Sequence, residues 1–107
     1  MQSKSLFTSI AAGFFLFFVA LESFCAVHTV VIEGMKFIPE KLSVKLNDTV
    51  IWVNKDFFPH TATTVKKGFD SKGIESNSSW TFIAKDKGVF PYTCTLHPTM
   101  NATLTVN

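Results

Sequence analysis

The residues of this chain whose types could do chemistry together are a cysteine, two histidines and a methionine. Cys94, His97 and Met100 follow one another at intervals of three residues, and His60 lies upstream, directly after a proline. A thiolate, two imidazoles and a thioether are the donor set of mononuclear electron-transfer copper sites, in which a methionine is the weak axial ligand. The spacing predicts that one loop between two strands carries three of these four residues.

The N-terminal segment has the pattern of a secretory signal peptide. Lys4 supplies a positive charge, residues 10–21 form an unbroken apolar run, and a more polar exit follows. The run is too short for a confident membrane span. We therefore expect residues 1–25 to be a cleaved signal peptide and residues 26–107 to form one domain.

The position of cleavage follows from the residues before it. Cleavage after Cys25 places Ser23 and Cys25 at the two positions that need small residues, whereas cleavage after Ala26 would place bulky Phe24 at one of them. We therefore expect cleavage after Cys25. A lipid-modified Cys25 and an uncleaved anchor are the alternatives.

With the leader removed, Cys94 is the one cysteine of the domain. Exported proteins commonly pair their cysteines in disulfides, and Cys94 has no partner for one. A buried inert thiol and an intermolecular disulfide are the alternatives to a metal ligand. The presence of His97 and Met100 at their spacings favours the metal ligand.

The charge of the chain indicates no nucleic-acid partner. Ten lysines, no arginine and eight acidic residues give a net charge of +2, and the lysines are dispersed rather than clustered. Two further expectations concern the mature chain: it has no membrane span, and it is a monomer.

Alternating apolar and polar residues indicate β-strands. Leu42, Val44 and Leu46 alternate with polar residues, which gives one buried face and one solvated face. Further strands are expected at residues 49–53, 80–83, 89–93 and 103–106. No segment after the leader has a helical apolar stripe. The pattern predicts an all-β fold, a β-sandwich of about seven to eight short strands.

The alternation also predicts which way the cysteine points. Phe90, Tyr92 and Cys94 share one face of their strand, so an inward Tyr92 implies an inward Cys94 at the end of the sandwich. A sulfur in that position is shielded from water and from oxidation. His97 and Met100 are then expected on the returning loop, with the last strand starting at Asn101.

On these residues the chain resembles a small cupredoxin of the plastocyanin/azurin family, of the amicyanin-like kind, over residues 27–107. The matching segments are Met35–Phe37, Asp48–Val50, Trp52–Asp56, Pro59–His60 and Tyr92–Met100. The short spacing from cysteine to histidine to methionine is the form found in amicyanins. The resemblance implies a Greek-key β-sandwich and a type 1, or blue, copper centre.

The resemblance also implies the ligands. His60, Cys94 and His97 would be the strong ligands of one copper ion, cycling between Cu(I) and Cu(II), and Met100 would be the weak axial ligand. No position is kept open for a substrate, so we expect no enzymatic activity. We expect a one-electron carrier of the bacterial periplasm.

Three further residues take roles from the family. Asn54 matches a position whose side chain and backbone tie the two ligand-bearing loops together. Pro98 would limit the freedom of the loop and remove a backbone donor near the copper. Leu96 is a departure, because amicyanins often carry proline there, and it could soften the loop.

Family precedent supplies the expected partners, which are redox proteins. A periplasmic dehydrogenase is the precedent for the electron donor, and a c-type cytochrome for the acceptor. An apolar patch around His97 would dock them. Its candidate residues are Met35, Phe57, Phe58, Pro59, Leu96 and Pro98. The alternative for Phe57 and Phe58 is a place in the core.

Two other function classes stay open. The same ligands could serve a periplasmic copper-binding or trafficking protein, although such proteins more often expose additional methionine or histidine ligands. A metal-free interaction module is the other class, and the intact ligand set speaks against it.

His28 raises the question of a second copper site. Cleavage after Cys25 would place it third from a free amine, where amine, backbone amides and imidazole can enclose Cu(II) in a square plane. The alternative is that His28 begins the first strand, which would prevent this wrapping.

Overall fold

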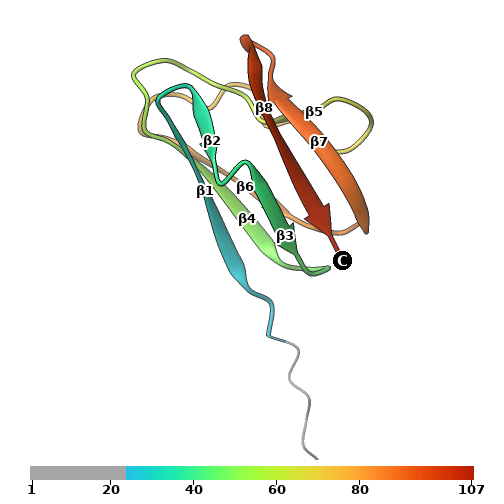
Figure 1. Ribbon diagram of the computed structural model, residues 1–107. Helices are drawn as coiled ribbons and strands as arrows, with labels where there is room; N and C mark the ends of the chain where they lie inside the picture. The colour runs from blue at the N-terminus through green and yellow to red at the C-terminus, as the bar shows by residue number, and fades with distance from the viewer. Residues whose placement is uncertain (1–23) are drawn as a thin grey trace, which may run out of the picture.

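The computed structural model describes residues 24–107, and these residues form eight strands in two facing sheets (Figure 1). The strands are β1 (Val27–Glu33), β2 (Lys36–Ile38), β3 (Lys41–Val44), β4 (Thr49–Asn54), β5 (Thr63–Thr64), β6 (Ser79–Ile83), β7 (Gly88–Cys94) and β8 (His97–Val106). Within this part of the chain, no helix is long and apolar enough to cross a membrane. The expected signal peptide lies almost wholly outside the described residues.

Both sheets mix parallel and antiparallel pairing. One sheet has the order β2-β1-β4-β6, in which β1 and β4 are parallel, and the other has the order β3-β8-β7-β5, in which β3 and β8 are parallel. The parallel pairs join strands that are not consecutive, so the chain crosses between the sheets. The prediction of an all-β sandwich with about seven to eight strands is confirmed.

The core lies between the sheets and is rich in aromatic side chains. Along β4, Val50, Trp52 and Asn54 are buried while the residues between them are partly exposed. The Trp52 indole Nε1–H donates to the Tyr92 hydroxyl at 3.3 Å, and the two rings meet edge to face. Each side chain of this size contributes roughly 2–3 kcal/mol when fully buried. Burial raises the pKa of Tyr92 to about 12, so this phenol stays neutral.

The inward direction predicted for Cys94 is confirmed. Tyr92 and Cys94 are buried on the same face of β7, and the exposed fraction of Cys94 is 0%. The aromatic core therefore lies directly behind the cysteine. Its sulfur is held by a strand and not by a flexible loop.

The last strand begins earlier than predicted. β8 starts at His97 and not at Asn101, and Cys94 pairs with His97 across a turn of two residues, Thr95 and Leu96. Because the turn is so short, β7 passes almost directly into β8. His97 and Met100 consequently lie on β8 itself, which restricts their backbones more than a loop would.

His28 lies in β1, where it pairs with Val50 of β4, and its Nε2 is 2.9 Å from a carboxylate oxygen of Asp48. This is the alternative in which the histidine begins the first strand. A copper wrap at His28 would have to break both contacts.

Candidate metal centre

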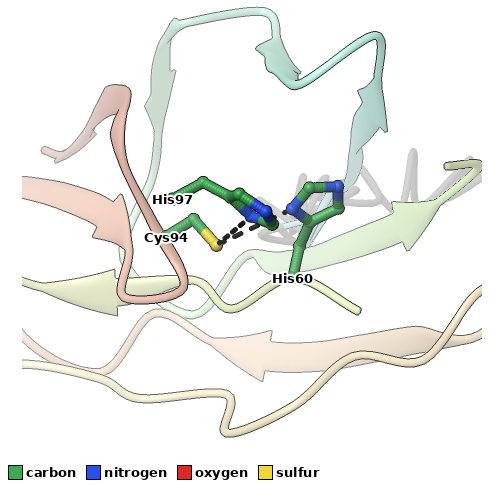
Figure 2. A group of neighbouring side chains, drawn as sticks. All are labelled: His60, Cys94 and His97. Carbon is green, nitrogen blue, oxygen red and sulfur yellow. Dashed lines mark hydrogen bonds between the residues drawn. The ribbon is translucent and has the colours of Figure 1, made fainter. Parts of the chain in front are cut away.

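Three of the four predicted ligands converge at one end of the sandwich. Cys94 ends β7, His97 begins β8, and His60 lies between β4 and β5 in an isolated bridge with Ile74. Figure 2 shows both imidazoles directed toward the cysteine sulfur. Their ligand atoms lie within 4.8 Å of one another. Cys94 and His60 are fully buried, and His97 is half-buried.

The distances fit one metal ion at the centre of this group. The Cys94 Sγ lies 3.7 Å from Nδ1 of His60 and 3.7 Å from Nδ1 of His97. First-row metals such as zinc bind imidazole nitrogen at about 2.0 Å and thiolate sulfur at about 2.3 Å, so a trigonal site separates these atoms by about 3.7 Å. A thiol could donate its one proton to one imidazole and accept an N–H from the other, but two such different hydrogen bonds would not be expected to have equal lengths. The equal distances therefore favour a shared ion.

Thr61 ties the two ligand-bearing segments together. Its backbone N–H donates to the Cys94 Sγ at 3.3 Å, and its Oγ1 accepts the Thr95 N–H at 2.9 Å. A donor on the sulfur stabilises the thiolate and restricts its motion. Sequence reasoning missed Thr61, although its place next to His60 was a usable signal.

The role expected of Asn54 is wrong in part. Its Nδ2 donates to the carbonyl oxygens of Phe58 and Ile74, and its Oδ1 accepts the Asp56 N–H. These bonds brace the segment that leads to His60, but none reaches the segment of Cys94. The reason is position, because Asn54 ends β4 six residues before His60, whereas Thr61 is adjacent to it.

Asp56 is the second residue that sequence reasoning left without a role. Its Oδ2 accepts the Nε2–H of His60 at 2.9 Å, and its two oxygens also accept the backbone N–H groups of Gly34 and Met35. Burial alone would raise the pKa of this carboxyl, but these donors outweigh burial and hold the pKa below its ordinary value. With the proton on Nε2, the Nδ1 lone pair of His60 faces the site.

We expect the change Asp56→Asn to weaken copper binding by about 10- to 100-fold, because an amide cannot fully replace the carboxylate that orients His60. Competition against a calibrated Cu(I) chelator measures this affinity. Asp86→Asn is the control, since Asp86 is exposed in the segment between β6 and β7. Equal affinities for the two variants would contradict the orienting role.

Met100, the predicted axial ligand, lies buried in β8 with 3% of its surface exposed. Its carbonyl oxygen accepts the Thr93 hydroxyl at 2.8 Å, which fixes the backbone opposite the end of β7. A cavity of about 300 Å³ lies beside it, lined also by Met35 and Phe37. The structure thus places Met100 at the same end of the sandwich as the triad.

The comparison that decides the family covers nearly the whole sequence. The model of the cupredoxin-like domain matches residues 6–106. The chain belongs to the cupredoxin family. Family membership and the donor set together confirm the expected cofactor, one copper ion.

Two characterised relatives of this cupredoxin are amicyanins. The amicyanin of Paracoccus versutus is 30% identical over 81 residues, which are 70% of this chain and 61% of that protein. The amicyanin of Paracoccus denitrificans is 28% identical over 94 residues, which are 83% of this chain and 72% of that protein. The chain therefore spans about three fifths of the first relative. The amicyanin-like resemblance is confirmed.

Solved structures agree with this assignment. An oxidised amicyanin variant superimposes with a TM-score of 0.72 at 27% identity, covering 76% of this chain and 82% of the other. A copper-containing nitrite reductase from Thermus scotoductus SA-01 matches with a TM-score of 0.71 at 25% identity. That match covers 75% of this chain but only 22% of the enzyme. The similarity to the enzyme therefore extends over a small part of it.

Proposed function

We propose that this cupredoxin is a one-electron carrier with a mononuclear type 1 copper centre. His60, Cys94 and His97 are assigned as the strong ligands and Met100 as the weak axial ligand. Bound copper supplies a one-electron couple between Cu(I) and Cu(II). Residues 1–25 are assigned as the leader, and residues 26–107 as the domain that works in the periplasm.

The observation that carries this proposal is that the candidate ligands are buried and are held in place by hydrogen bonds. Cys94 and His60 are fully buried, and hydrogen bonds from Thr61 and to Asp56 fix the sulfur and one imidazole. Ligands that are held in place move little when the charge of the metal changes, and this suits rapid electron exchange. With four protein ligands, the site keeps no position for a substrate, so we propose no enzymatic activity.

His97 is the assigned ligand through which electrons would pass between the copper site and the protein surface. It is half-buried, whereas the other assigned ligands are buried. Exposed apolar side chains come from the three segments that meet at the site: Met35 (38% exposed), Phe57 (92%), Phe58 (59%) and Leu96 (54%). The alternative of a core position for Phe57 and Phe58 is therefore wrong. Apolar surface of this kind suits weak, transient contacts with redox proteins.

The partners are proposed by class. A periplasmic dehydrogenase would donate the electron and a c-type cytochrome would accept it. Both would approach the apolar surface around His97, since that is where a ligand comes nearest to solvent.

Voltammetry combined with chelator competition tests the proposed function. A carrier gives a fast, reversible one-electron couple and retains its copper against a chelator over many turnovers. A copper-delivery protein would instead lose its metal readily to the chelator. Easy loss, or the lack of a reversible couple in the loaded protein, would overturn the electron-carrier assignment.

We expect Phe58→Ala and Leu96→Ala each to slow electron exchange with a partner by about tenfold, which corresponds to about 1.4 kcal/mol of docking energy. The visible spectrum should stay nearly unchanged, because neither side chain is assigned as a ligand. Stopped-flow mixing with a c-type cytochrome measures the rate. Val89→Ala is the matched control, since Val89 is 65% exposed at the opposite end of β7. Equal rates in all three variants would move the docking surface elsewhere.

A further inference from the structure

Asp48 is a buried carboxylate at the end of the sandwich opposite the copper centre. It lies in the turn between β3 and β4, and only 3% of its surface is exposed. In Figure 1 this turn lies beside the start of β1 and the C-terminus, far from the turn that joins β7 and β8. Backbone bonds between Asn107 and both Val44 and Leu46 place the end of β8 in the same region.

Three donors surround this carboxylate. Its Oδ1 accepts the Ala26 N–H at 2.9 Å, and its Oδ2 accepts the Lys45 N–H and contacts the His28 Nε2, each at 2.9 Å. Led by the His28 bond, these contacts lower the pKa of Asp48 to about 2, although burial opposes them. The carboxylate is therefore ionised at neutral pH.

The charge of Asp48 lacks a permanent partner of opposite sign among residues 24–107. The one basic side chain within ion-pair distance is His28, which is charged only when protonated. The neutral donors already outweigh the desolvation of this carboxylate, as its lowered pKa shows, but none of them carries a permanent positive charge. A fixed cation at one of the three donor positions would add a direct charge–charge attraction.

Ala26 occupies the donor position where such a cation can arise. Its N–H binds Asp48 and its carbonyl oxygen accepts the Thr49 N–H at 2.9 Å, so both of its backbone groups are used by the domain. Ala26, Phe24 and Cys25 are all exposed, so what distinguishes Ala26 is this pair of backbone bonds. The pairing of β1 with β4 begins at the next residue, Val27.

We propose that Ala26 is the first residue of the mature protein and that its α-ammonium group binds the Asp48 carboxylate. Hydrolysis of the Cys25–Ala26 bond in a signal peptidase consumes one water molecule and leaves a carboxylate on Cys25. The amine released on Ala26 takes up a proton at neutral pH. One N–H continues to point at Oδ1, and the positive charge arises where the carboxylate lacked one.

The alternative cleavage after Ala26 does not produce this contact. It would remove the residue whose N–H and carbonyl oxygen are both bonded, and it would leave Oδ1 without its donor. The new amine would lie on Val27, one Cα step of about 3.8 Å further along β1. The structure therefore favours cleavage after Cys25 on grounds independent of the leader's sequence.

This ion pair also competes with the square-planar copper wrap at His28. The wrap would need the Ala26 amine and the His28 imidazole on one metal ion, but both bind Asp48. It would also need the backbone of β1 to leave β4. We therefore expect copper to bind with a stoichiometry of one per chain, unchanged in His28→Ala.

The first test uses the chain from Ala26 to Asn107 with a free amine, made without export and loaded with copper. Acetylating that amine keeps an N–H donor and removes the charge, so it isolates the ion pair. We expect acetylation to lower Tm by about 5 °C at pH 7. In Asp48→Asn the acetylation should have no further effect, whereas Asp70→Asn, a change in an exposed aspartate beyond β5, should retain the full difference.

The difference should depend on pH in a defined direction. A neighbouring carboxylate raises the pKa of an α-amino group above its ordinary value of about 8, so the stabilisation is complete below that pH and is lost as pH rises through the raised pKa. On the acid side it is lost as Asp48 is protonated, between its ordinary pKa and about 2. The other titratable groups at this end are His28, the ammonium groups of Lys45 and Lys85, and the terminal carboxylate of Asn107. Equal Tm values for the free and acetylated chains at pH 7 would overturn the ion pair.

The second test concerns processing, and it rests on the proposed export of the protein. Mass spectrometry of the exported chain should show Ala26 as the first residue. A chain that begins at any other residue would overturn the proposed cleavage. Neither test depends on electron transfer, so their failure is distinguishable from failure of the carrier function.

Discussion

Replacing Cys94 with serine should abolish the intense visible absorption of the copper-loaded protein. The band arises from charge transfer between a thiolate and copper, and Cys94 supplies the only sulfur in the triad. A serine oxygen at this position can still accept the Thr61 N–H, but it cannot supply that transition. Absorption spectra of the two proteins at equal copper content measure the loss.

The same variant should keep its fold. Cysteine and serine have nearly the same shape, and the buried hydroxyl has a donor available in Thr61. We expect a loss of about 1–2 kcal/mol in the free energy of unfolding of the metal-free protein. Far-UV circular dichroism and urea unfolding check this. Thr95→Ser is the neighbouring control and should keep the colour. Intense colour in Cys94→Ser would remove the central assignment.

Replacing Met100 with leucine should keep the colour and raise the reduction potential. Leucine fills nearly the same volume in the core, so the triad stays in place. In its proposed role the thioether would be a weak donor that favours Cu(II), so its removal would shift the balance toward Cu(I). We expect a rise of about 60–120 mV, which corresponds to a ten- to hundredfold change at about 59 mV per decade for one electron.

Met35→Leu is the matched control, because it makes the same methionine-to-leucine change at a residue that is not assigned as a ligand. Met35 lines the same cavity as Met100 but is 38% exposed, at the turn between β1 and β2. Its replacement should leave the potential unchanged within a few tens of millivolts, since it is not assigned as a ligand. Cyclic voltammetry at one pH and ionic strength gives both values. Equal shifts in the two variants would indicate that burial of the site, and not axial coordination, sets the potential.

An aspartate contacts a histidine at each end of the sandwich, but the two histidines differ in their surroundings. At one end Asp56 accepts a hydrogen bond from His60, whose other ring nitrogen faces Cys94, and at the other end Asp48 contacts His28 and the backbone N–H of Ala26. In both cases a carboxylate with a lowered pKa accepts three hydrogen bonds. His60 is fully buried beside Cys94, which fits its proposed role as a ligand, whereas His28 is half-buried.

The sequence by itself determined the donor set and the class of fold. Cys94, His97 and Met100 are close in the chain, so any turn between two strands brings them together, and alternation in β7 settles that Cys94 points inward. The same alternation, with turn residues between the strands, is enough to predict a sandwich. These features depend on neighbours in sequence and on the period of a strand, both of which can be read directly.

Only the tertiary structure decided how the donors are held. Thr61 and Asp48 contact groups that are distant in sequence, and the Asp56 carboxylate that orients His60 is itself held by the distant N–H groups of Gly34 and Met35. Alternation tells which face of a strand is buried, but it does not tell which distant N–H or imidazole lies opposite a given oxygen. The early start of β8 has the same origin, because pairing with β7 imposes strand geometry on a segment whose own sequence indicates a loop. Register and sheet order fix these contacts, and both arise only when the two sheets pack.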